Sequence, residues 1–295
     1  MPAATRPPFK SSERTGEAAA PDLLAIRNAI TSAIDAGVWA TTPPPQEITI
    51  AGIRALRFIP NGESRGTVLH FHGGGFRLGC PEQVGPFAAA LAARCSVSVI
   101  CPAYRLAPEH PFPAGLSDGW SVLQEIEALD NLPLILSGDS AGGGLAASLA
   151  ALSTSNTFRP AGLSLLSPWL DLTVDSSSYQ QNAASDPIFS AASAREAAQL
   201  YLQGHSPDDP LASPLCGSAK RLPPTLINVG AGEVLLDDAK LFHNKLIAEN
   251  IPAQLHIVKD MEHVAVTRSF ELAGAKETFE TLVSFISSRL SSTAE

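Results

Sequence analysis

A strand that runs directly into a Gly-Asp-Ser-Ala-Gly turn constrains this chain more than any other feature. The apolar segment 134–137 leads into the turn at 138–142, and a helix of small residues is expected over 144–152. In a Gly-x-Ser-x-Gly turn between a strand and a helix, the backbone is strained and the serine oxygen is exposed above the sheet. Glycines at both ends of the turn remove Cβ atoms that would otherwise collide. This context favours Ser140 as a nucleophile over the alternative, an ordinary glycine-rich turn.

A second glycine-rich segment, His-Gly-Gly-Gly at 72–75, follows the short apolar strand expected over 67–69. Consecutive glycines let the backbone approach a ligand closely, and such loops present N–H groups to the tetrahedral intermediate of acyl transfer. The first N–H groups of the helix after the serine point to the same place. We therefore expect an oxyanion hole formed by the N–H groups of Gly74, Gly75 and Ala141, with Gly73 as the alternative donor.

The histidines around this loop are given a supporting role. His72 is expected to fix the loop through hydrogen bonds rather than to act in catalysis. His70 and His72 would share one face of a strand, which is a spacing that a metal site can use. Because no cysteine or acidic cluster accompanies them in the sequence, we expect no metal here.

A nucleophilic serine needs a base, and in folds with this turn the order along the chain is serine, acid, histidine. His263 lies on a loop directly after the strand expected over 254–258. Functional residues of α/β sheets gather at such strand ends. The other histidines lie upstream of the serine, within a strand or a helix, or in loops that do not follow a strand. We predict His263 as the base, against the alternative of a solvated loop histidine.

The carboxylate that would orient this histidine is expected in the loop after the strand at 224–229. Glu233 stands in that loop, from which its side chain would reach back to His263. Asp237 and Asp238 follow at the start of a helix and are its rivals, although acids there also complement the helix dipole. We predict Glu233 as the acid that holds the imidazole tautomer and stabilises the imidazolium.

These motifs together resemble the signatures of the hormone-sensitive-lipase-like family of α/β-hydrolases, over about residues 56–290. The resemblance is carried by the segments 72–75, 104–109, 138–143, 167–173 and 230–238. It implies an α/β-hydrolase fold with a helical cap, no metal or cofactor, and carboxylesterase activity on small acyl esters. It also implies Ser140 as nucleophile, His263 as base and Glu233 as acid. Many members carry aspartate at the acid position, so the glutamate departs from the family pattern.

Two alternatives to this function stay open. One is a different hydrolase on the same residues, acting on lactones, carbamates or amides, because specificity depends on cap side chains. The other is a non-catalytic small-molecule receptor of the same fold, similar to the plant gibberellin receptors, which lack the histidine. The presence of both Ser140 and His263 argues against the receptor.

The chain is expected to form one catalytic core with additions. Strands and helices alternate along most of its length, which predicts a mostly parallel sheet with helices on both faces. We expect an N-terminal tail and cap helix in 1–45, the two parts of the core in 46–170 and 223–295, and a cap insertion in 171–222. Insertions at strand ends build lids over active sites.

Helices are expected over 22–39 and 191–202, and near the C-terminus over about 270–290. Apolar residues of the insertion and residues beside the glycine-rich motifs are candidates for the substrate pocket, and packing within the cap is the alternative for the apolar ones. These pocket candidates are Phe76, Asp139, Ile188, Phe189, Tyr201, Leu202 and Leu211.

Composition bounds the partners and the compartment. The net charge of −9 argues against nucleic acid and anionic membrane surfaces and leaves a small-molecule ester as the expected partner. No apolar run approaches the roughly 20 residues of a membrane helix, and no signal peptide is expected. The four cysteines lack C-x-x-C spacing, so we expect buried free thiols in the reducing cytoplasm. The resemblance also allows a homodimer through the last strand and helix, roughly 254–290.

Overall fold

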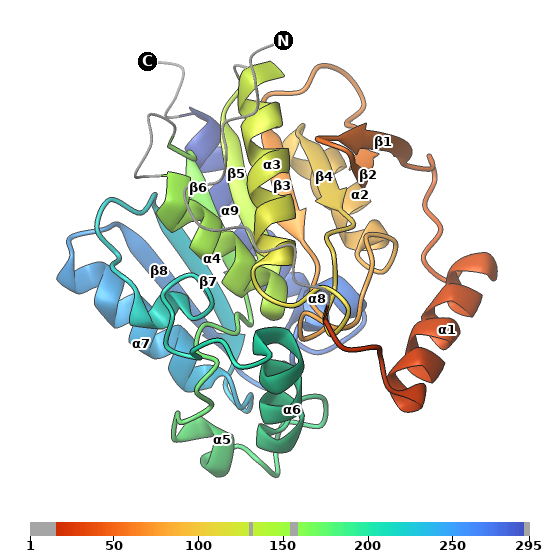
Figure 1. Ribbon diagram of the computed structural model, residues 1–295. Coiled ribbons are helices and arrows are strands. Elements are labelled where there is room, and N and C mark those ends of the chain that lie inside the picture. Colours follow the sequence, from red (N-terminus) through yellow and green to blue (C-terminus); the bar gives the residue numbers. More distant parts are fainter. Residues whose placement is uncertain (1–15, 130–131, 154–158, 292–295) are drawn as a thin grey trace.

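A sheet of eight strands forms the centre of the described molecule, which a computed structural model covers over residues 16–129, 132–153 and 159–291 (Figure 1). The strands are Gln46–Ile50 (β1), Ile53–Phe58 (β2), Thr67–Phe71 (β3), Ser98–Pro102 (β4), Leu134–Asp139 (β5), Gly162–Leu166 (β6), Thr225–Gly230 (β7) and Ala253–Val258 (β8). They lie in the order β1-β2-β4-β3-β5-β6-β7-β8. β2 is antiparallel to both of its neighbours, and every other neighbouring pair is parallel.

Helices cover both faces of the sheet. The helical elements are Pro21–Asp35 (α1), Gly85–Cys95 (α2), Ala114–Leu129 (α3), Ala141–Ser153 (α4), Ser178–Gln181 (α5), Ala191–Leu202 (α6), the 3₁₀ turn Pro214–Cys216 (η1), Leu236–Ala248 (α7), Ala265–Arg268 (α8) and Ala275–Ser291 (α9). One hydrophobic core lies between the sheet and α3, α4 and α7, and the other lies between the sheet and α2, α8 and α9. The predicted α/β-hydrolase architecture, a mostly parallel sheet with helices on both faces, is confirmed.

The burial of the central strands explains why each of them appears in the sequence as a short, continuous apolar run. β3, β4, β5, β6 and β7 are buried along their whole length. A strand with helices on both faces needs apolar side chains in both directions, so its pattern is continuous rather than alternating. The alanines and glycines of α4 allow this helix to lie close against the sheet directly after β5. This packing positions the turn between β5 and α4.

Two parts of the chain lie outside this layered core. α5, α6 and η1 fall between β6 and β7, within the segment expected as a cap insertion, and Figure 1 shows α5 and α6 beyond the end of the sheet. α1 stands to one side, with Leu23 as its buried residue. The division into core and cap units stays a prediction, and residues 1–15 of the expected tail lie outside the described residues.

Two predicted helix boundaries were wrong, and both errors occur at glycines. The helix expected to reach residue 39 ends at Asp35, and Gly37 follows with a φ of 73°. The last helix begins at Ala275 rather than near residue 270, because Gly274 has a φ of 74° and the residues before it form turns. A glycine in the left-handed region ends or precedes a helix without the strain that a Cβ atom would bring.

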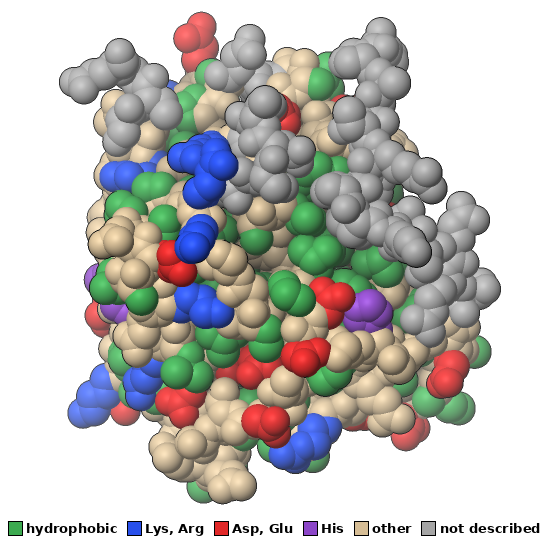
Figure 2. All heavy atoms as spheres, turned by 60° about the vertical axis from the view of Figure 1, so that its left-hand side comes forward, with side chains coloured by type: hydrophobic (Ala, Val, Ile, Leu, Met, Phe, Trp, Pro, Cys, Tyr) green, Lys and Arg blue, Asp and Glu red, His purple; other side chains and the backbone are tan. Residues whose placement is uncertain are grey.

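The surface and the cysteines test the compositional expectations in part. All four cysteines are free, but only Cys95 and Cys101 are buried; Cys216 is exposed at the end of η1, so the expectation of burial was wrong there. Figure 2 shows acidic and basic side chains interspersed among hydrophobic ones on one face of the molecule, rather than a patch of one charge. Among the helices of the described residues, none is both long and apolar enough to span a membrane.

Candidate active site

The turn between β5 and α4 has the geometry of a nucleophile elbow. Ser140 has a φ of 53°, and its N–H donates to the carbonyl of Leu166 at 2.9 Å. A Cβ atom on Gly138 would lie 2.2 Å from the carbonyl oxygen of Gly142, and one on Gly142 would lie 2.0 Å from that of Phe71. Only glycine fits at either position, because no side chain can yield to a backbone clash of this size. The local sequence therefore presents the Ser140 hydroxyl at the end of β5.

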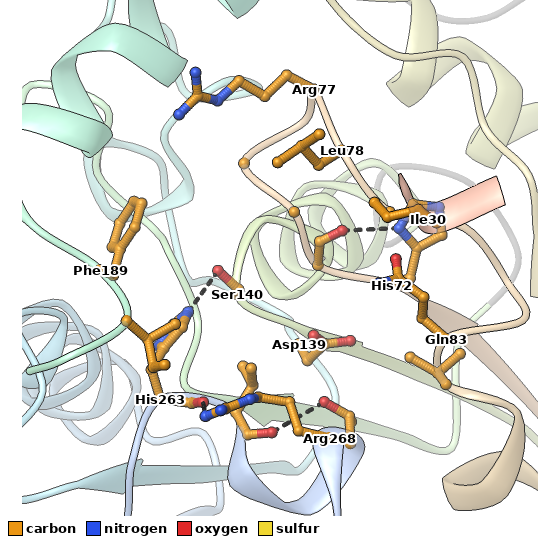
Figure 3. A pocket seen from close by; sticks show the side chains of 18 of the residues that line it. Ile30, His72, Arg77, Leu78, Gln83, Asp139, Ser140, Phe189, His263 and Arg268 are labelled. Carbon is orange, nitrogen blue, oxygen red and sulfur yellow. Dashed lines mark hydrogen bonds between the residues drawn. The ribbon is translucent and has the colours of Figure 1, made fainter. Parts of the chain in front are cut away.

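The structure brings Ser140, His263 and Glu233 into one chain of hydrogen bonds. The Ser140 Oγ lies 3.0 Å from the His263 Nε2, and the His263 Nδ1 lies 2.7 Å from the Glu233 Oε2 (Figure 3 shows the first contact). A carboxylate only accepts, so Nδ1 carries the proton of the neutral ring and Nε2 is left as an acceptor. The three side chains are buried. This arrangement lets the imidazole accept the hydroxyl proton.

The electrostatics of His263 are set by its carboxylate neighbours. Burial alone would lower the pKa of the imidazole. The hydrogen bond to Glu233 and the charge of that carboxylate oppose this, with smaller contributions from Asp186 and Asp139, and the pKa lies above its ordinary value of 6.5. The surroundings thus favour the imidazolium that forms when the ring takes a proton.

Glu233 is held by two donors on its other oxygen. Its Oε1 accepts from the hydroxyl of Ser167 at 2.7 Å and from the N–H of Gly230 at 2.5 Å. The longer glutamate side chain folds back against Gly230, where a Cβ atom would lie 2.9 Å from the same oxygen. Ser167, directly after β6, has a φ of 45° and was not predicted as a site residue. Its position at a strand end beside the nucleophile strand was the available signal.

The rival acids face away from the imidazole. Asp237 accepts the N–H of Ser178 at 2.9 Å. Asp238 is fully buried and accepts the N–H groups of Leu170 and Asp171 at 3.0 and 3.1 Å. Burial raises the pKa of Asp238 to about 7. Both carboxylates fasten the start of α7 to the segment after β6, so only Glu233 of the candidate acids contacts His263.

The glycine loop lies against the elbow. Gly74 and Gly75 have φ values of 113° and 61°, which a residue with a side chain adopts only under strain. The Gly74 carbonyl accepts the N–H groups of Arg77 and Leu78, which closes the loop into a turn. Within the described part of the chain, the N–H groups of Gly74, Gly75 and Ala141 have no hydrogen-bond acceptor. Gly73, Gly74 and Gly75 line the same cavity as Ser140.

His72 holds this loop in place, and His70 is bonded to the neighbouring strand. The His72 Nδ1 donates to the Gly73 carbonyl at 2.8 Å, and the Tyr104 hydroxyl donates to the His72 carbonyl at 2.7 Å. Burial lowers the pKa of His72, which keeps the ring neutral. His70 contacts Asp139 and Ser137 on β5, at 3.1 and 3.0 Å. Both rings therefore have structural partners within the fold.

A cavity of about 610 Å³ opens above Ser140. Figure 3 shows Phe189 and His263 on one side of the serine and Ile30, His72 and Gln83 on the other. Of the predicted pocket residues, Asp139, Ile188 and Phe189 line this cavity. Missed lining residues include Trp39, Arg77, Leu78, Gln83, Thr267 and Arg268. Several of these stand a few positions after a predicted motif, which was a usable signal.

The other predicted pocket residues do not line this cavity, because their side chains pack into the core. Phe76 and Tyr201 are buried and stack on each other with ring centroids 3.9 Å apart. Leu202 is buried beside them, and Leu211 packs against the same core. Neighbouring side chains cover their apolar surface. The residues of α6 that line the cavity are Ser193 and Ala197.

Known proteins with similar sequences are hydrolases. The model of a family described by the α/β-hydrolase fold matches residues 68–267. An acetyl-hydrolase of Streptomyces hygroscopicus is 34% identical over 245 residues, which cover 79% of this chain and 82% of the relative. An esterase of Acinetobacter venetianus is 36% identical over 213 residues, covering 71% of this chain and 70% of the relative.

Solved structures agree with this assignment. A hormone-sensitive lipase from a metagenome library superimposes with a TM-score of 0.85 at 28% identity, covering 93% of each chain. An esterase of the bacterial hormone-sensitive lipase family gives a TM-score of 0.82 at 29% identity, covering 93% of this chain and 100% of the other. The chain belongs to the α/β-hydrolase family and, within it, to the hormone-sensitive-lipase-like esterases.

Proposed function

We propose that the protein is a serine carboxylesterase that hydrolyses short-chain acyl esters through an acyl-enzyme on Ser140. The observation that carries the proposal is the hydrogen-bond chain from the Ser140 hydroxyl through His263 to Glu233. The free N–H groups of Gly74, Gly75 and Ala141 beside that hydroxyl support it. Nucleophile, base, orienting acid and oxyanion donors are the parts that acyl transfer requires.

Acylation follows from these positions. The His263 Nε2 takes the hydroxyl proton as the Ser140 oxygen attacks the ester carbonyl, and Glu233 stabilises the imidazolium. The developing oxyanion accepts hydrogen bonds from the N–H groups of the glycine loop and of Ala141. The imidazolium then gives its proton to the alkoxide that leaves, so the carbon–oxygen ester bond breaks and an alcohol departs.

Deacylation repeats the sequence with water. The imidazole takes a proton from a water molecule as its oxygen attacks the acyl carbon of the Ser140 ester. The second tetrahedral oxyanion accepts hydrogen bonds from the same N–H groups. When it collapses, the bond to the Ser140 oxygen breaks and His263 returns the proton to that oxygen. The acid product leaves and the resting tautomer of His263 is restored.

The cavity supports a small ester as substrate. Its volume of about 610 Å³ lies within the range of small-molecule sites. Its walls combine apolar side chains such as Ile30 and Phe189 with the polar groups of Gln83 and Arg268. The relative from Streptomyces hygroscopicus is named an acetyl-hydrolase, which points to a short acyl group. A panel of ester, lactone, carbamate and amide substrates would rank these reaction classes directly.

Replacing the nucleophile tests the proposal. Ser140→Ala should abolish hydrolysis of p-nitrophenyl acetate and butyrate while the circular dichroism spectrum stays unchanged. Labelling by a fluorophosphonate should also be lost, whereas the wild-type protein should be labelled at Ser140. Turnover of the variant at the wild-type rate would overturn the serine mechanism, and a wild-type protein that resists labelling would favour a receptor.

A further inference from the structure

The residues 178–189, here called the cap segment, are bonded directly to the loop that carries Glu233. The Asn182 Nδ2 donates to the Glu233 carbonyl at 2.7 Å and to the Ala231 carbonyl at 3.3 Å. The Ser185 hydroxyl donates to the Gly232 carbonyl at 2.8 Å. The Ser178 hydroxyl donates to the Val234 carbonyl at 2.6 Å. All four carbonyls of residues 231–234, here called the acid loop, thus bind side chains from the cap segment.

Asp186 joins this loop to a second part of the site. Its side chain is buried, with the residue only 8% exposed, although the neighbouring Ile188 is 45% exposed. Its Oδ2 accepts the N–H of Val234 at 2.9 Å. Its Oδ1 accepts the N–H groups of Ile188 and Phe189 at 3.0 and 2.9 Å. One carboxylate therefore fixes both the acid loop and the turn that carries Phe189.

Phe189 transmits this restraint to the base. Its ring lies nearly parallel to the His263 imidazole, at 13° and with centroids 5.6 Å apart. The same ring meets Trp169 edge-on, with centroids 5.4 Å apart. Phe189 thus lies between a fully buried tryptophan and the base, and it forms a wall beside the imidazole (Figure 3).

We propose that Asp186 is a positioning residue, which aligns Glu233 and His263 by binding the acid loop and the Phe189 turn at once. The inference rests on the serine mechanism proposed above and adds to it a restraint supplied from outside the core sheet. Misalignment of reacting groups by about 1 Å can cost on the order of 100-fold in rate. The loss should appear in kcat, because Asp186 is not among the residues that line the cavity.

The charge of Asp186 gives a second readout. The charged groups around His263 are Glu233, Asp186 and Asp139, together with Arg268, whose Nη1 lies 3.4 Å from the His263 carbonyl and pairs with Glu262. The Asp186 carboxylate raises the pKa of the imidazole. Removing its charge should lower this pKa, so the acid limb of the pH–rate profile should move to lower pH.

Asp186→Asn tests the inference, with Asp237→Asn as the matched control. The amide keeps one acceptor oxygen, but its NH₂ group takes the place of the other. The hydrogen bonds either to Val234 or to Ile188 and Phe189 are therefore lost. Asp237 also binds a cap-segment N–H, that of Ser178, but it does not contact the acid loop or the Phe189 turn. Asp186→Asn should lower kcat by about 10- to 100-fold with KM little changed, and Asp237→Asn should change neither.

Three outcomes would overturn the proposal. They are an equal loss in both variants, a loss confined to KM, and an acid limb that does not move in Asp186→Asn. If Asp186→Asn does not fold, as judged by circular dichroism, Asn182→Ala serves as the second test of the proposal. This substitution removes the donor to the carbonyls of Ala231 and Glu233, and Asn182 is only half-buried. The substitution should lower kcat several-fold, and wild-type kcat would reject the idea.

Fluorophosphonate labelling separates the two levels of the argument. If wild-type protein is not labelled at Ser140, the proposed serine mechanism fails. If wild-type protein is labelled, and the labelling rate of Asp186→Asn equals that of Asp237→Asn, only the positioning role fails. The expected result is slower labelling of Asp186→Asn, in proportion to its loss of kcat.

Discussion

α1 and the cap segment both reach the same cavity from outside the sheet, but they are attached in different ways. α1 contributes Ile26 and Ile30 to the cavity wall while most of its surface stays exposed. It is held through Arg27, which donates to the carbonyls of Arg77 and Ala107 at 3.0 and 2.6 Å and pairs with Glu109 at 2.6 Å. The cap segment instead binds the acid loop directly, through Asn182, Ser185 and the buried Asp186.

This difference predicts that α1 affects substrate binding, whereas the cap segment affects the rate of the reaction. The Arg27 tether ends on Arg77, Ala107 and Glu109, none of which is bonded to His263, so loosening it changes the shape of the cavity. The bonds of the cap segment end on the acid loop and on the ring beside His263, so loosening them changes the alignment of the reacting groups. We expect changes in α1 to alter KM and changes in the cap segment to alter kcat.

The largest expected effect concerns the acid itself. Glu233→Gln removes the charge that stabilises the imidazolium and the acceptor that selects the tautomer, so kcat should fall by about 10³-fold or more. Asp237→Asn, which alters the anchoring of the cap segment to α7, should leave kcat close to the wild-type value. Steady-state hydrolysis of p-nitrophenyl butyrate measures both. A larger loss of kcat in Asp237→Asn than in Glu233→Gln would make Asp237 the acid. Asp237 would then act in the reaction and not only as an anchor of the cap segment.

A smaller effect is expected when the tether of α1 is cut. Arg27→Met keeps an unbranched apolar stem but removes the donors, so α1 should become less ordered over the cavity. KM should rise several-fold while kcat stays close to the wild-type value. Arg94→Met is the control, because Arg94 forms an exposed ion pair with Glu280 on α9. A fall in kcat with unchanged KM would show that α1 also acts on the alignment of Ser140, His263 and Glu233.

The smallest expected effect concerns the midpoint of the acid limb of the pH–rate profile. Activity needs the neutral imidazole, and the pKa of His263 is raised above 6.5, so kcat/KM of the wild-type protein should fall with a midpoint above pH 6.5 as the pH is lowered. Arg27→Met should leave that midpoint in place, because Arg27 makes no contact with the base. A pH–rate profile of each protein would check this, and a shift in the Arg27 variant would contradict it.

The parts of the site that could be predicted are those determined by local sterics. Gly138 and Gly142 are needed for a turn that no other residue permits, and Ser140 then stands between them. His263 and Glu233 follow strand ends, where a parallel sheet brings separate loops to one edge. These inferences needed only the order of strands and helices and the turn chemistry around them.

The rest depended on contacts between distant segments. Ser167 directly follows a strand and Asp186 stands in a serine- and aspartate-rich stretch that resembles an exposed loop, and the roles of both exist only because the acid loop contacts them. Phe76 was predicted in the pocket because it follows the glycine-rich loop, and Tyr201 because it is an apolar residue of the insertion, but the two rings stack on each other. Hydrophobicity predicts burial, and it does not say whether a side chain is buried by protein or by substrate.

Gly142 has a consequence for anyone who wishes to remodel this protein. Its α-carbon faces the carbonyl of Phe71 so closely that a methyl group would overlap it, and Phe71 directly precedes the glycine loop. The turn that carries Ser140 and the start of the glycine loop are therefore packed directly against each other, with no side chain between them. Changes of specificity will have to come from the movable walls, since neither of these two segments can shift without carrying the other along.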